Sequence, residues 1–573
     1  MKDNTLKNGT TQQSFLHGSL ILVISTALVK IIGAIYRIPL ANILDTAGMG
    51  FYSTAYDLYV PMYSIAMAGL PVAISRIVAE HTASGRYKDA KKTLKMAQLS
   101  FLVTGSTGFI LLLILAFLLT GPLGVFNIGA LPGILAIAPC LIFCCIMSAY
   151  RGYYEGLRNM TPTAISSVIE ALGKLVFGFS IAYLVLIKTG NYPFAAAGAL
   201  LGITIGTAVS SLYLVIKYKM TDKNDITVEM LEASPDAKSG RETLNGIILI
   251  AVPIVLGSLV NNVTSLIDVS MVQSQLNNAI QKAPQYFETA YKNLIADEIA
   301  KNPDFNWLTD LPNSLYGCHR GYAFSIYNLV PVLTSVLGVS AIPVLASAWA
   351  KRDLDDVKSN VQTMLRTTAL IALPAGLGIA AMADGILSLL YNNPEAIAIA
   401  APNLRILGIC AVFAGLNSPV VNMLQAIGKQ NVPLKNIAVG AVLKIVINFI
   451  LVGTPEINIL GVPIGTAACY AYICIANVIC FVKYSGVKPN YISVFIKPFV
   501  AATACAVTAF AASKLLPYVI KSQSVVTVGS IAVAAIIYLV MLSILKAIEK
   551  DDIISLPKGK KIAKVLEKLG IIR

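Results

Sequence analysis

Basic side chains inside long apolar stretches are the residues of this sequence whose types and spacing could do chemistry. Lys30 and Arg37 lie in the first stretch, and a helix would place them on one face, about two turns apart. Arg76 and Lys174 lie in later stretches. Ionisable groups are costly in hydrocarbon and usually face a wet cavity or a partner. Because Lys and Arg bind phosphate oxygens well, we predict that these four residues form an anionic head-group site, although Arg76 could instead reach the cytoplasmic surface.

Acidic and amide side chains in the same kind of stretch are candidates for binding a coupling cation or a proton. These candidates are Asp57, Asp268, Glu170, Asn261 and Asn262. Glu170 stands one helical turn before Lys174, the favourable order for an ion pair on a helix. Two interpretations of this pair stay open: an internally neutralised structural pair, or part of the predicted site.

Four prolines inside apolar stretches point to bends in their helices. They are Pro61, Pro71, Pro331 and Pro343. Proline removes a backbone donor and can kink a helix. The bends could be hinges for alternating access, or static kinks that shape a cavity.

Fourteen apolar stretches must position these residues. The chain has 573 residues, 56% hydrophobic and 13% charged, whereas a soluble globular protein has about 25% charged residues. Because about 20 apolar residues span a bilayer as a helix, we predict an all-α polytopic membrane protein. The predicted helices cover residues 17–43, 51–79, 95–119, 130–150, 162–187, 194–216, 244–272, 322–349, 362–390, 399–424, 435–453, 461–482, 496–518 and 524–547.

The second six stretches repeat signatures of the first six. Pro61 and Pro331 are about 270 residues apart, as are Pro71 and Pro343. Residues 205–208 and 464–467 both read Ile-Gly-Thr-Ala. The matching helices are an even number apart, so the two halves have the same orientation. This pattern predicts a parallel pseudo-twofold repeat of two six-helix lobes, followed by two C-terminal helices.

The repeat sets the predicted organisation of the chain. It consists of a cytoplasmic N-terminus over 1–16, an N-lobe over 17–216, a cytoplasmic linker over 217–243, a C-lobe over 244–482 with an external loop over 273–320, helices 13 and 14 within 496–547, and a basic cytoplasmic tail over 548–573.

The net charge of +15 comes largely from Lys and Arg in the segments between predicted helices, and their placement indicates the topology. Basic residues concentrate before the first helix, after helices 2, 6 and 8, and in the tail, whereas the loops 44–50, 120–129, 391–398 and 454–460 contain no Lys or Arg. Basic loops face the cytoplasm, so both termini are predicted to be cytoplasmic. The N-terminal residues resemble no cleavable signal.

Three further segments carry structural predictions. In the external loop, residues 285–300 read as an amphipathic helix, which could rest on the membrane, cap a cavity or dock a partner. Residues 558–573 read as a basic amphipathic helix for anionic lipid. Gly198, Gly202 and Gly206 give one helix a smooth face for close packing.

Motifs of common enzymes are missing from the sequence. The nine cysteines and three histidines show no metal-ligand spacing, and no Walker A, HExxH or GxSxG motif occurs. We therefore predict a protein that is not an enzyme, has no cofactor and does not bind nucleic acid, with Na⁺ or H⁺ as a candidate coupling ion.

Several motifs resemble a known family. Residues 151–166 read Arg-Gly-Tyr-Tyr-Glu-Gly-Leu-Arg-Asn-Met-Thr-Pro-Thr-Ala-Ile-Ser, residues 69–76 read Gly-Leu-Pro-Val-Ala-Ile-Ser-Arg, and residues 315–317 read Leu-Tyr-Gly. These segments are similar to the stage V sporulation protein B branch of polysaccharide-biosynthesis membrane proteins. That branch belongs to the multidrug, oligosaccharidyl-lipid and polysaccharide exporter superfamily, with the MurJ-type lipid II flippases. The resemblance covers about residues 15–548.

The resemblance implies a flippase for an undecaprenyl-pyrophosphate-linked oligosaccharide, foremost the peptidoglycan precursor lipid II. It implies membrane lipids and cell-wall synthesis proteins as partners, and helices 13 and 14 as a groove for the prenyl tail. The family's basic residues around a glycine in helix 1 match Lys30, Gly33 and Arg37, with Lys where the better-known branch has Arg and one extra residue before Arg37. Tyr52 stands where that branch has an acid in helix 2.

Four alternatives stay open at this point. They are a multidrug cation antiporter of the same superfamily, an exporter of another lipid-linked polysaccharide unit, an intramembrane enzyme that uses polyprenyl substrates, and a scaffold for wall synthesis. The sequence does not separate a role in general wall growth from one in sporulation. The basic excess in helices 1, 2 and 5 argues against a cation exporter.

Overall fold

The computed structural model describes the backbone of residues 15–67 and 70–549. Within these ranges every regular element is a helix. The described side chains exclude those of residues 15–17, 19–20, 23, 65–67, 221–225, 252–266, 268 and 336–343. The predicted amphipathic helix over 558–573 lies outside the described residues.

The described residues contain 11 helical segments that are long and apolar enough to cross a membrane. The first, Ile24–Ser64, joins the predicted helices 1 and 2. Predicted helices 7 and 8 are absent from this set because they run through 252–266 and 336–343, whose side chains are not described. The structure therefore confirms an all-helical protein with many candidate spans, and the total of fourteen stays a prediction.

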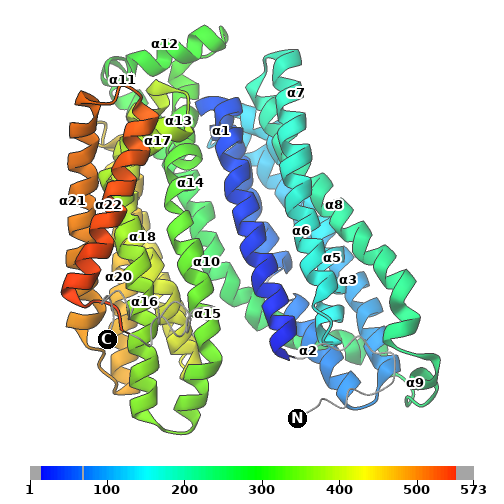
Figure 1. Cartoon of the computed structure of the whole chain (residues 1–573). Helices are drawn as coiled ribbons and strands as arrows, with labels where there is room; N and C mark the ends of the chain where they lie inside the picture. Colours follow the sequence, from blue (N-terminus) through cyan, green and yellow to red (C-terminus); the bar gives the residue numbers. More distant parts are fainter. Residues whose placement is uncertain (1–14, 68–69, 550–573) are drawn as a thin grey trace. The chain divides into compact units, whose positions relative to one another are not determined.

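Two compact units divide the chain, Met1–Ser270 and Met271–Arg573. In unit 1 the elements are α1 (Phe15–Met67), α2 (Leu70–Ala83), α3 (Tyr87–Thr120), η1 (Ile128–Ala130), α4 (Leu131–Ile137), α5 (Cys140–Gly156), α6 (Thr161–Gly173), η2 (Lys174–Gly178), α7 (Phe179–Thr189), α8 (Tyr192–Asp225), α9 (Val228–Glu232) and the first part of α10 (Gly240–Lys282). Helix α8 packs against α1, α4, α5, α6 and α7, and Figure 1 shows it beside α6 and α7.

Glycines allow the close packing of α8. A Cβ atom at Gly202 would overlap the backbone of Gly178, and one at Gly206 would lie 2.8 Å from the carbonyl oxygen of Glu170. The close-packing face predicted from Gly198, Gly202 and Gly206 is confirmed. It brings η2 and the end of α6 against α8, where they line the site described below.

A kink separates the two predicted helices within α1. Asp45 has φ 53° and ψ −162°, and its carboxylate accepts a hydrogen bond of 2.8 Å from the backbone N–H of Thr46. Pro61 lies inside α1, whereas Pro71 stands in the first turn of α2. The predicted helix over 51–79 thus corresponds to two described helices: α1, which ends at Met67, and α2, which begins at Leu70.

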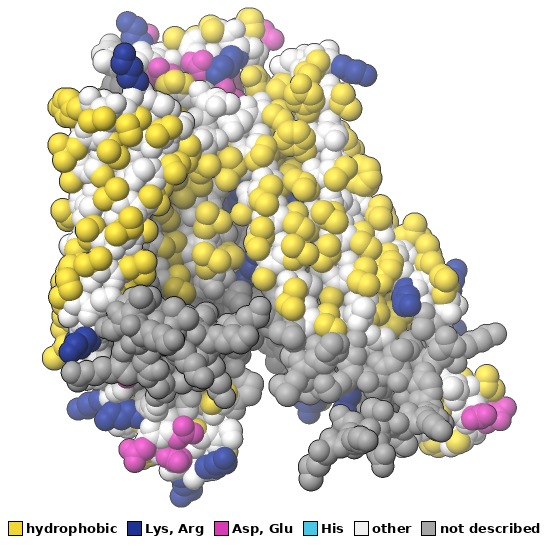
Figure 2. Space-filling model, in the orientation of Figure 1, with side chains coloured by type: hydrophobic (Ala, Val, Ile, Leu, Met, Phe, Trp, Pro, Cys, Tyr) yellow, Lys and Arg dark blue, Asp and Glu magenta, His cyan; other side chains and the backbone are white. Residues whose placement is uncertain are grey.

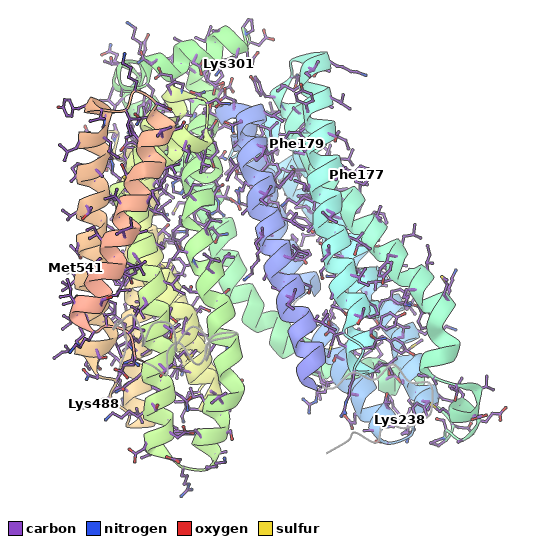
Figure 3. The ribbon with its side chains drawn as sticks, in the orientation of Figure 1. Phe177, Phe179, Lys238, Lys301, Lys488 and Met541 are labelled. Carbon is purple, nitrogen blue, oxygen red and sulfur yellow. The ribbon has the colours of Figure 1, made fainter. Side chains whose placement is uncertain are left out.

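The segment before α10 is attached to the start of α3. Asp89 is fully buried and its carboxylate accepts hydrogen bonds from Arg86 Nε (2.6 Å) and from the backbone N–H of Lys238 (2.7 Å). Figure 3 marks Lys238 in this segment. The first part of α10, up to Ser270, belongs to unit 1, whereas the sequence predicts helix 7 as part of the second lobe. The lobe boundaries inferred from the repeat stay a prediction.

Unit 2 is also built from helices. Its elements are α11 (Pro284–Ala290), α12 (Lys292–Lys301), α13 (Trp307–Gly317), η3 (Cys318–Ala323), α14 (Phe324–Tyr327), α15 (Leu329–Ala350), α16 (Leu354–Ala381), α17 (Ala383–Leu390), α18 (Pro394–Ala426), α19 (Asn431–Val452), η4 (Asn458–Leu460), α20 (Gly461–Ser485), η5 (Ile492–Ile496), α21 (Lys497–Leu515), η6 (Leu516–Tyr518) and α22 (Gln523–Leu545). Helix α18 packs against α15, α16 and α20, while α21 and α22 lie side by side (Figure 1).

The long predicted external loop is mostly helical, but its amphipathic helix is broken. Residues 285–300 form α11 and α12, which meet at Tyr291. The Tyr291 hydroxyl donates a 2.6 Å hydrogen bond to Asn458 Oδ1, and burial raises its pKa. Asn393 Nδ2 donates to Asp297 (3.1 Å), and Phe287 and Leu294 are buried. The segment therefore packs on loops of its own unit (Figure 1).

The exposed surface of the helices is apolar. On the face seen in Figure 2, hydrophobic side chains cover the sides of the helices, and charged side chains gather near their ends. Exposed residues such as Leu99, Val103 and Phe117 of α3 belong to this surface. An apolar belt of this kind suits lipid rather than water. Together with the candidate spans, it identifies a multi-pass membrane protein.

Candidate functional site

A cavity of about 430 Å³ lies within unit 1. This volume is in the range of about 300–1,000 Å³ that is typical of small-molecule sites. Its walls come from α1, α5, α6, η2 and α8. The charged side chains that line it are Arg151, Glu170 and Lys174, and the tyrosines that line it are Tyr36, Tyr56, Tyr59 and Tyr63.

Lys174 is held in this cavity by aromatic rings. Its Nζ lies 5.0 Å from the ring centroid of Tyr36 and 5.3 Å from that of Tyr56. The Tyr36 hydroxyl in turn donates to the carbonyl oxygen of Ala199 (3.3 Å), which fixes the ring against α8. Cation–π contacts contribute about 0.5–2 kcal/mol and leave the ammonium with its charge and its donors. Lys174 can therefore bind an anion in the cavity.

A π-helical turn begins at Lys174. It covers Lys174–Gly178 and joins α6 to α7 in one helical run. Single π turns inside helices often occur at functional sites. Figure 3 marks Phe177 and Phe179 on this run; Phe177 is exposed, and Phe179 stacks on Tyr183 with ring centroids 6.4 Å apart. The π turn thus places Lys174 in the cavity and the apolar ring of Phe177 on the exposed side of the same helical run.

Glu170 pairs with Arg151. Arg151 Nη2 lies 3.0 Å from Glu170 Oε2, and the two side chains are 12% and 25% exposed. Arg151 Nε also donates to Ser166 Oγ (2.9 Å). The sequence left open a neutralised Glu170–Lys174 pair, but the ion pair in the structure joins Glu170 to α5. The three charged lining residues therefore sum to a net positive charge.

Four tyrosines of α1 form a continuous row beside these charges. Tyr52 and Tyr56 stack with centroids 5.9 Å apart and planes at 6°. Tyr56 and Tyr59 are 6.2 Å apart, and Tyr59 and Tyr63 are 5.6 Å apart. The Tyr59 hydroxyl is hydrogen-bonded to the thiol of Cys140 at 3.2 Å. The row is anchored to α5 at its middle and presents aromatic surface to the cavity.

The predicted head-group residues do not all share this cavity. Lys174 lines it. Arg37, which follows the lining residue Tyr36, lies close enough to Lys174 for their charges to interact. Lys30 is half-buried on α1, next to the lining residue Val29. Arg76 is exposed on α2 and is not a lining residue. Lys174 is therefore the best-placed of the four.

The predicted ion-coupling and hinge residues are more dispersed. Glu170 lines the cavity, whereas Asp57 is buried on α1 beside it and is not a lining residue. Pro331 stands in the first turn of α15. The side chains of Asn261, Asn262, Asp268 and Pro343 lie outside the described residues. Their proposed roles, like those of the other prolines, stay predictions.

Sequence reasoning missed Arg151 and the tyrosines as site residues. Tyr52, Tyr56, Tyr59 and Tyr63 follow the spacing of one helix face, a signal that was readable in the sequence. Arg151 begins the Arg-Gly-Tyr-Tyr segment that carries the family resemblance. Its partnership with Glu170 had no signal, because it depends on how α5 packs beside α6.

The family of the chain follows from comparison with known proteins. Residues 15–349 match the polysaccharide biosynthesis protein family, which is more than half of the chain. The chain belongs to this family. Residues 320–450 of this polysaccharide biosynthesis protein also match the MatE family.

Curated relatives match over most of their length. Stage V sporulation protein B of Bacillus subtilis (strain 168) is 25% identical, over 95% of this chain and 98% of the relative. The lipid II flippase MurJ of the same organism is 24% identical, over 82% of this chain and 83% of the relative. The similarity to stage V sporulation protein B thus extends over nearly the whole of both sequences, and the similarity to MurJ over about four fifths of each.

Solved structures show the same fold. A lipid II flippase MurJ in an inward closed conformation has a TM-score of 0.65 with 14% identity, over 91% of this chain and 98% of that chain. An inward-facing multidrug resistance MATE family transporter has a TM-score of 0.59 with 17% identity, over 80% of this chain and 98% of that chain. This polysaccharide biosynthesis protein therefore has the fold of MurJ and MATE transporters.

Proposed function

We propose that the protein is a flippase that moves an undecaprenyl-pyrophosphate-linked oligosaccharide, foremost lipid II, across the bacterial cytoplasmic membrane. The observation that carries this proposal is the cationic cavity, in which Lys174 contacts the rings of Tyr36 and Tyr56 while Glu170 pairs with Arg151. A diphosphate could bind Lys174 without displacing a carboxylate. The relationship to MurJ and to stage V sporulation protein B supports this substrate class.

The chemistry of such a substrate fits a transporter rather than an enzyme. A diphosphate–sugar head is too polar to cross hydrocarbon unaided, while its prenyl tail can stay in lipid. Moving the head requires binding and release but no covalent step. Lys174 would hold the diphosphate, Arg37 would add positive charge nearby, and α21 and α22 would offer an apolar groove for the tail.

The proposed cycle is alternating access. The head group would load from the cytoplasm, the two units would move relative to each other, and release would follow on the outer side. The proposed hinge positions are Pro61, Pro71, Pro331 and Pro343. The membrane potential, Na⁺ or H⁺ would drive the cycle, with Asp57, Glu170 and the residues around Asp268 as coupling candidates.

The proposed topology has fourteen helices in two parallel six-helix lobes with both termini in the cytoplasm. The Ile-Gly-Thr-Ala repeat supports this arrangement. Gly206 lies against the backbone of Glu170 and Lys174, and Gly465 lies against the Asn448 side chain and, farther away, the carbonyl oxygen of Lys444. Each motif therefore contacts a helix with an in-span lysine. Cell-wall synthesis proteins are proposed partners on the outer side, where the external loop would stand.

A multidrug cation antiporter is the second candidate, and the MATE-like fold favours it. Aromatic rings and a carboxylate are the groups that bind organic cations. In this cavity, however, the Lys174 ammonium already occupies the faces of Tyr36 and Tyr56, and Glu170 is paired. A cationic drug would be repelled there, so the lipid-linked anion fits the cavity better.

Complementation tests the proposed function. A bacterium depleted of its lipid II flippases would express wild type, Lys174→Met, Lys30→Ala or Arg37→Ala, and lipid II exposed on the outer surface would be measured. Loss of a charge-assisted hydrogen bond of about 1.5–3 kcal/mol should reduce the exposed lipid II of Lys174→Met by about tenfold or more. Lys188→Met, at an exposed lysine near the end of α7, is the matched control and should behave as wild type.

The outcomes separate the candidates. Rescue by wild type and the control, but not by membrane-inserted Lys174→Met, supports both the substrate and the site. Rescue by all variants would keep the flippase and remove the site assignment. No rescue by well-expressed wild type would contradict lipid II transport and favour another lipid-linked glycan or drug export.

A further inference from the structure

The tyrosine row extends along the cavity beyond the ring that contacts the Lys174 ammonium. Tyr56, Tyr59 and Tyr63 occupy successive positions on one face of α1 and all line the cavity. Tyr56 and Tyr63 are half-buried, whereas Tyr59 is only 4% exposed. The two outer rings therefore offer accessible surface, and the inner ring fills the space between them. Of these three, only Tyr56 contacts the Lys174 ammonium, and Tyr59 is anchored to the thiol of Cys140. Cation binding at Lys174 therefore does not account for the half-buried ring of Tyr63.

Polar groups surround the row. Ser64 follows Tyr63 on α1, Ser167 faces the cavity from α6, and the Arg151–Glu170 pair lines the same space. These groups can donate and accept hydrogen bonds. The cavity thus combines a wall of aromatic rings, in which neighbouring planes are tilted by 44° and 38°, with a polar rim. Lys174 marks one end of the wall through its contact with Tyr56.

A pyranose ring has the complementary surface. Its axial C–H groups form an apolar face with slight positive charge, which packs on the negative face of an aromatic ring. Its hydroxyls radiate from the edge of the ring, where hydrogen-bonding side chains must meet them. A sugar joined directly to a diphosphate would place these two surfaces side by side, in the order that the row and Lys174 provide.

We propose that Tyr56, Tyr59 and Tyr63 form a sugar-binding wall for the glycan of the substrate, with Tyr63 as the platform farther from the diphosphate. The proposal rests on the proposed function, because it assumes a lipid-linked sugar diphosphate in this cavity. The proposal adds that the tyrosines recognise the sugar of this substrate. Recognition then has two separable parts, charge at Lys174 and sugar at the row.

Tyr63→Leu is the sharpest variant for a test, because the structure places no cation–π contact between Tyr63 and Lys174 among the described residues. Leucine keeps apolar volume but removes the aromatic face, and Tyr63→Phe keeps the face. Tyr183→Leu on α7 makes the same exchange outside the cavity lining and is the matched control.

The experiment measures equilibrium binding of two probes to the full-length protein in nanodiscs: lipid II and undecaprenyl diphosphate, which has no sugar. Tyr63→Leu should weaken lipid II binding by about three- to tenfold, the size of one aromatic contact. It should leave undecaprenyl diphosphate binding within about twofold of wild type, which also shows that the variant is folded. Tyr63→Phe and Tyr183→Leu should bind both probes as wild type does.

Three results would overturn the sugar wall. They are an unchanged affinity of Tyr63→Leu for lipid II, an equal loss for both probes, and a loss with Tyr63→Phe as large as with leucine. The failure of the proposed function looks different, because wild type would then bind neither probe. Binding of both probes by wild type, with loss of both in Lys174→Met, retains the proposed function whatever Tyr63 does.

Discussion

Charge pairing in the cavity is decided at the level of single residues. Glu170 and Lys174 are neighbours on one helical run, yet Glu170 pairs with Arg151 of α5 and Lys174 lies between two tyrosine rings. Arg151 holds the Glu170 carboxylate through Nη2 and the Ser166 hydroxyl through Nε, two donors of one planar guanidinium group. Lys174 is therefore placed to bind the substrate, while Arg151 lines the same cavity with its charge neutralised by Glu170.

Replacing Glu170 with glutamine should make the cavity bind anions more tightly. Glu170→Gln removes the carboxylate that neutralises Arg151, so both cations would face the diphosphate. We expect about three- to tenfold tighter binding of undecaprenyl diphosphate, less than a fully buried pair would give because the pair is partly exposed. The gain should shrink at high salt. Glu242→Gln, at an exposed site at the start of α10, is the control; unchanged or weaker binding by Glu170→Gln would contradict the account.

Helix contacts at glycine set the position of the site at the scale of elements. Gly178 of η2 and Gly202 of α8 approach so closely that a Cβ at Gly202 would overlap the backbone of Gly178. This approach fixes the π turn that begins at Lys174. Gly378 of α16 is a contrasting case, because a Cβ there would meet no atom within 4 Å.

Alanine at Gly202 should therefore destabilise the protein, although alanine is the better helix former. Forced separation of α8 from η2 should cost about 1–3 kcal/mol, and the thermal unfolding temperature in detergent should fall. Gly378→Ala should leave that temperature unchanged or raise it slightly. Equal unfolding temperatures for both variants would show that the α8 contact is not tight.

The sequence predicted the elements better than it predicted their interruptions. Apolar runs located most helices, and the glycine spacing located the packed face of α8. The break at Tyr291 was missed because it depends on a hydrogen bond to Asn458, which is far away in the chain. The cavity was predicted only in part. Lys174 could be found because it is a charged residue in an apolar stretch, whereas the Arg151–Glu170 pair depends on packing between helices.

At the scale of the whole molecule, two compact units of helices carry an apolar surface suited to lipid. The placement of basic residues in the loops predicts the orientation of the protein in the membrane. Arg86 and the first turns of α3, with Lys88, Lys91 and Lys92, are basic and should face the cytoplasm, while α11 and α12 should stand outside the cell.

Thiol labelling on intact cells tests this orientation. Ser84→Cys and Lys292→Cys place new thiols at exposed sites at the end of α2 and the start of α12. Eight of the nine natural cysteines are buried and Cys480 is half-buried, so the unmodified protein should give a low background. A membrane-impermeant maleimide should label Lys292→Cys on intact cells and Ser84→Cys only after the membrane is opened. The reverse pattern would invert the proposed topology.

Translocation by the purified protein tests the central claim most directly. The full chain would be reconstituted into liposomes that contain lipid II, and the rate at which lipid II becomes accessible on the opposite leaflet would be measured for wild type, Lys174→Met and Lys188→Met. The account predicts that wild type and Lys188→Met accelerate translocation over protein-free liposomes, and that Lys174→Met is about tenfold slower or more. No acceleration by wild type, or an equal rate for Lys174→Met, would contradict it.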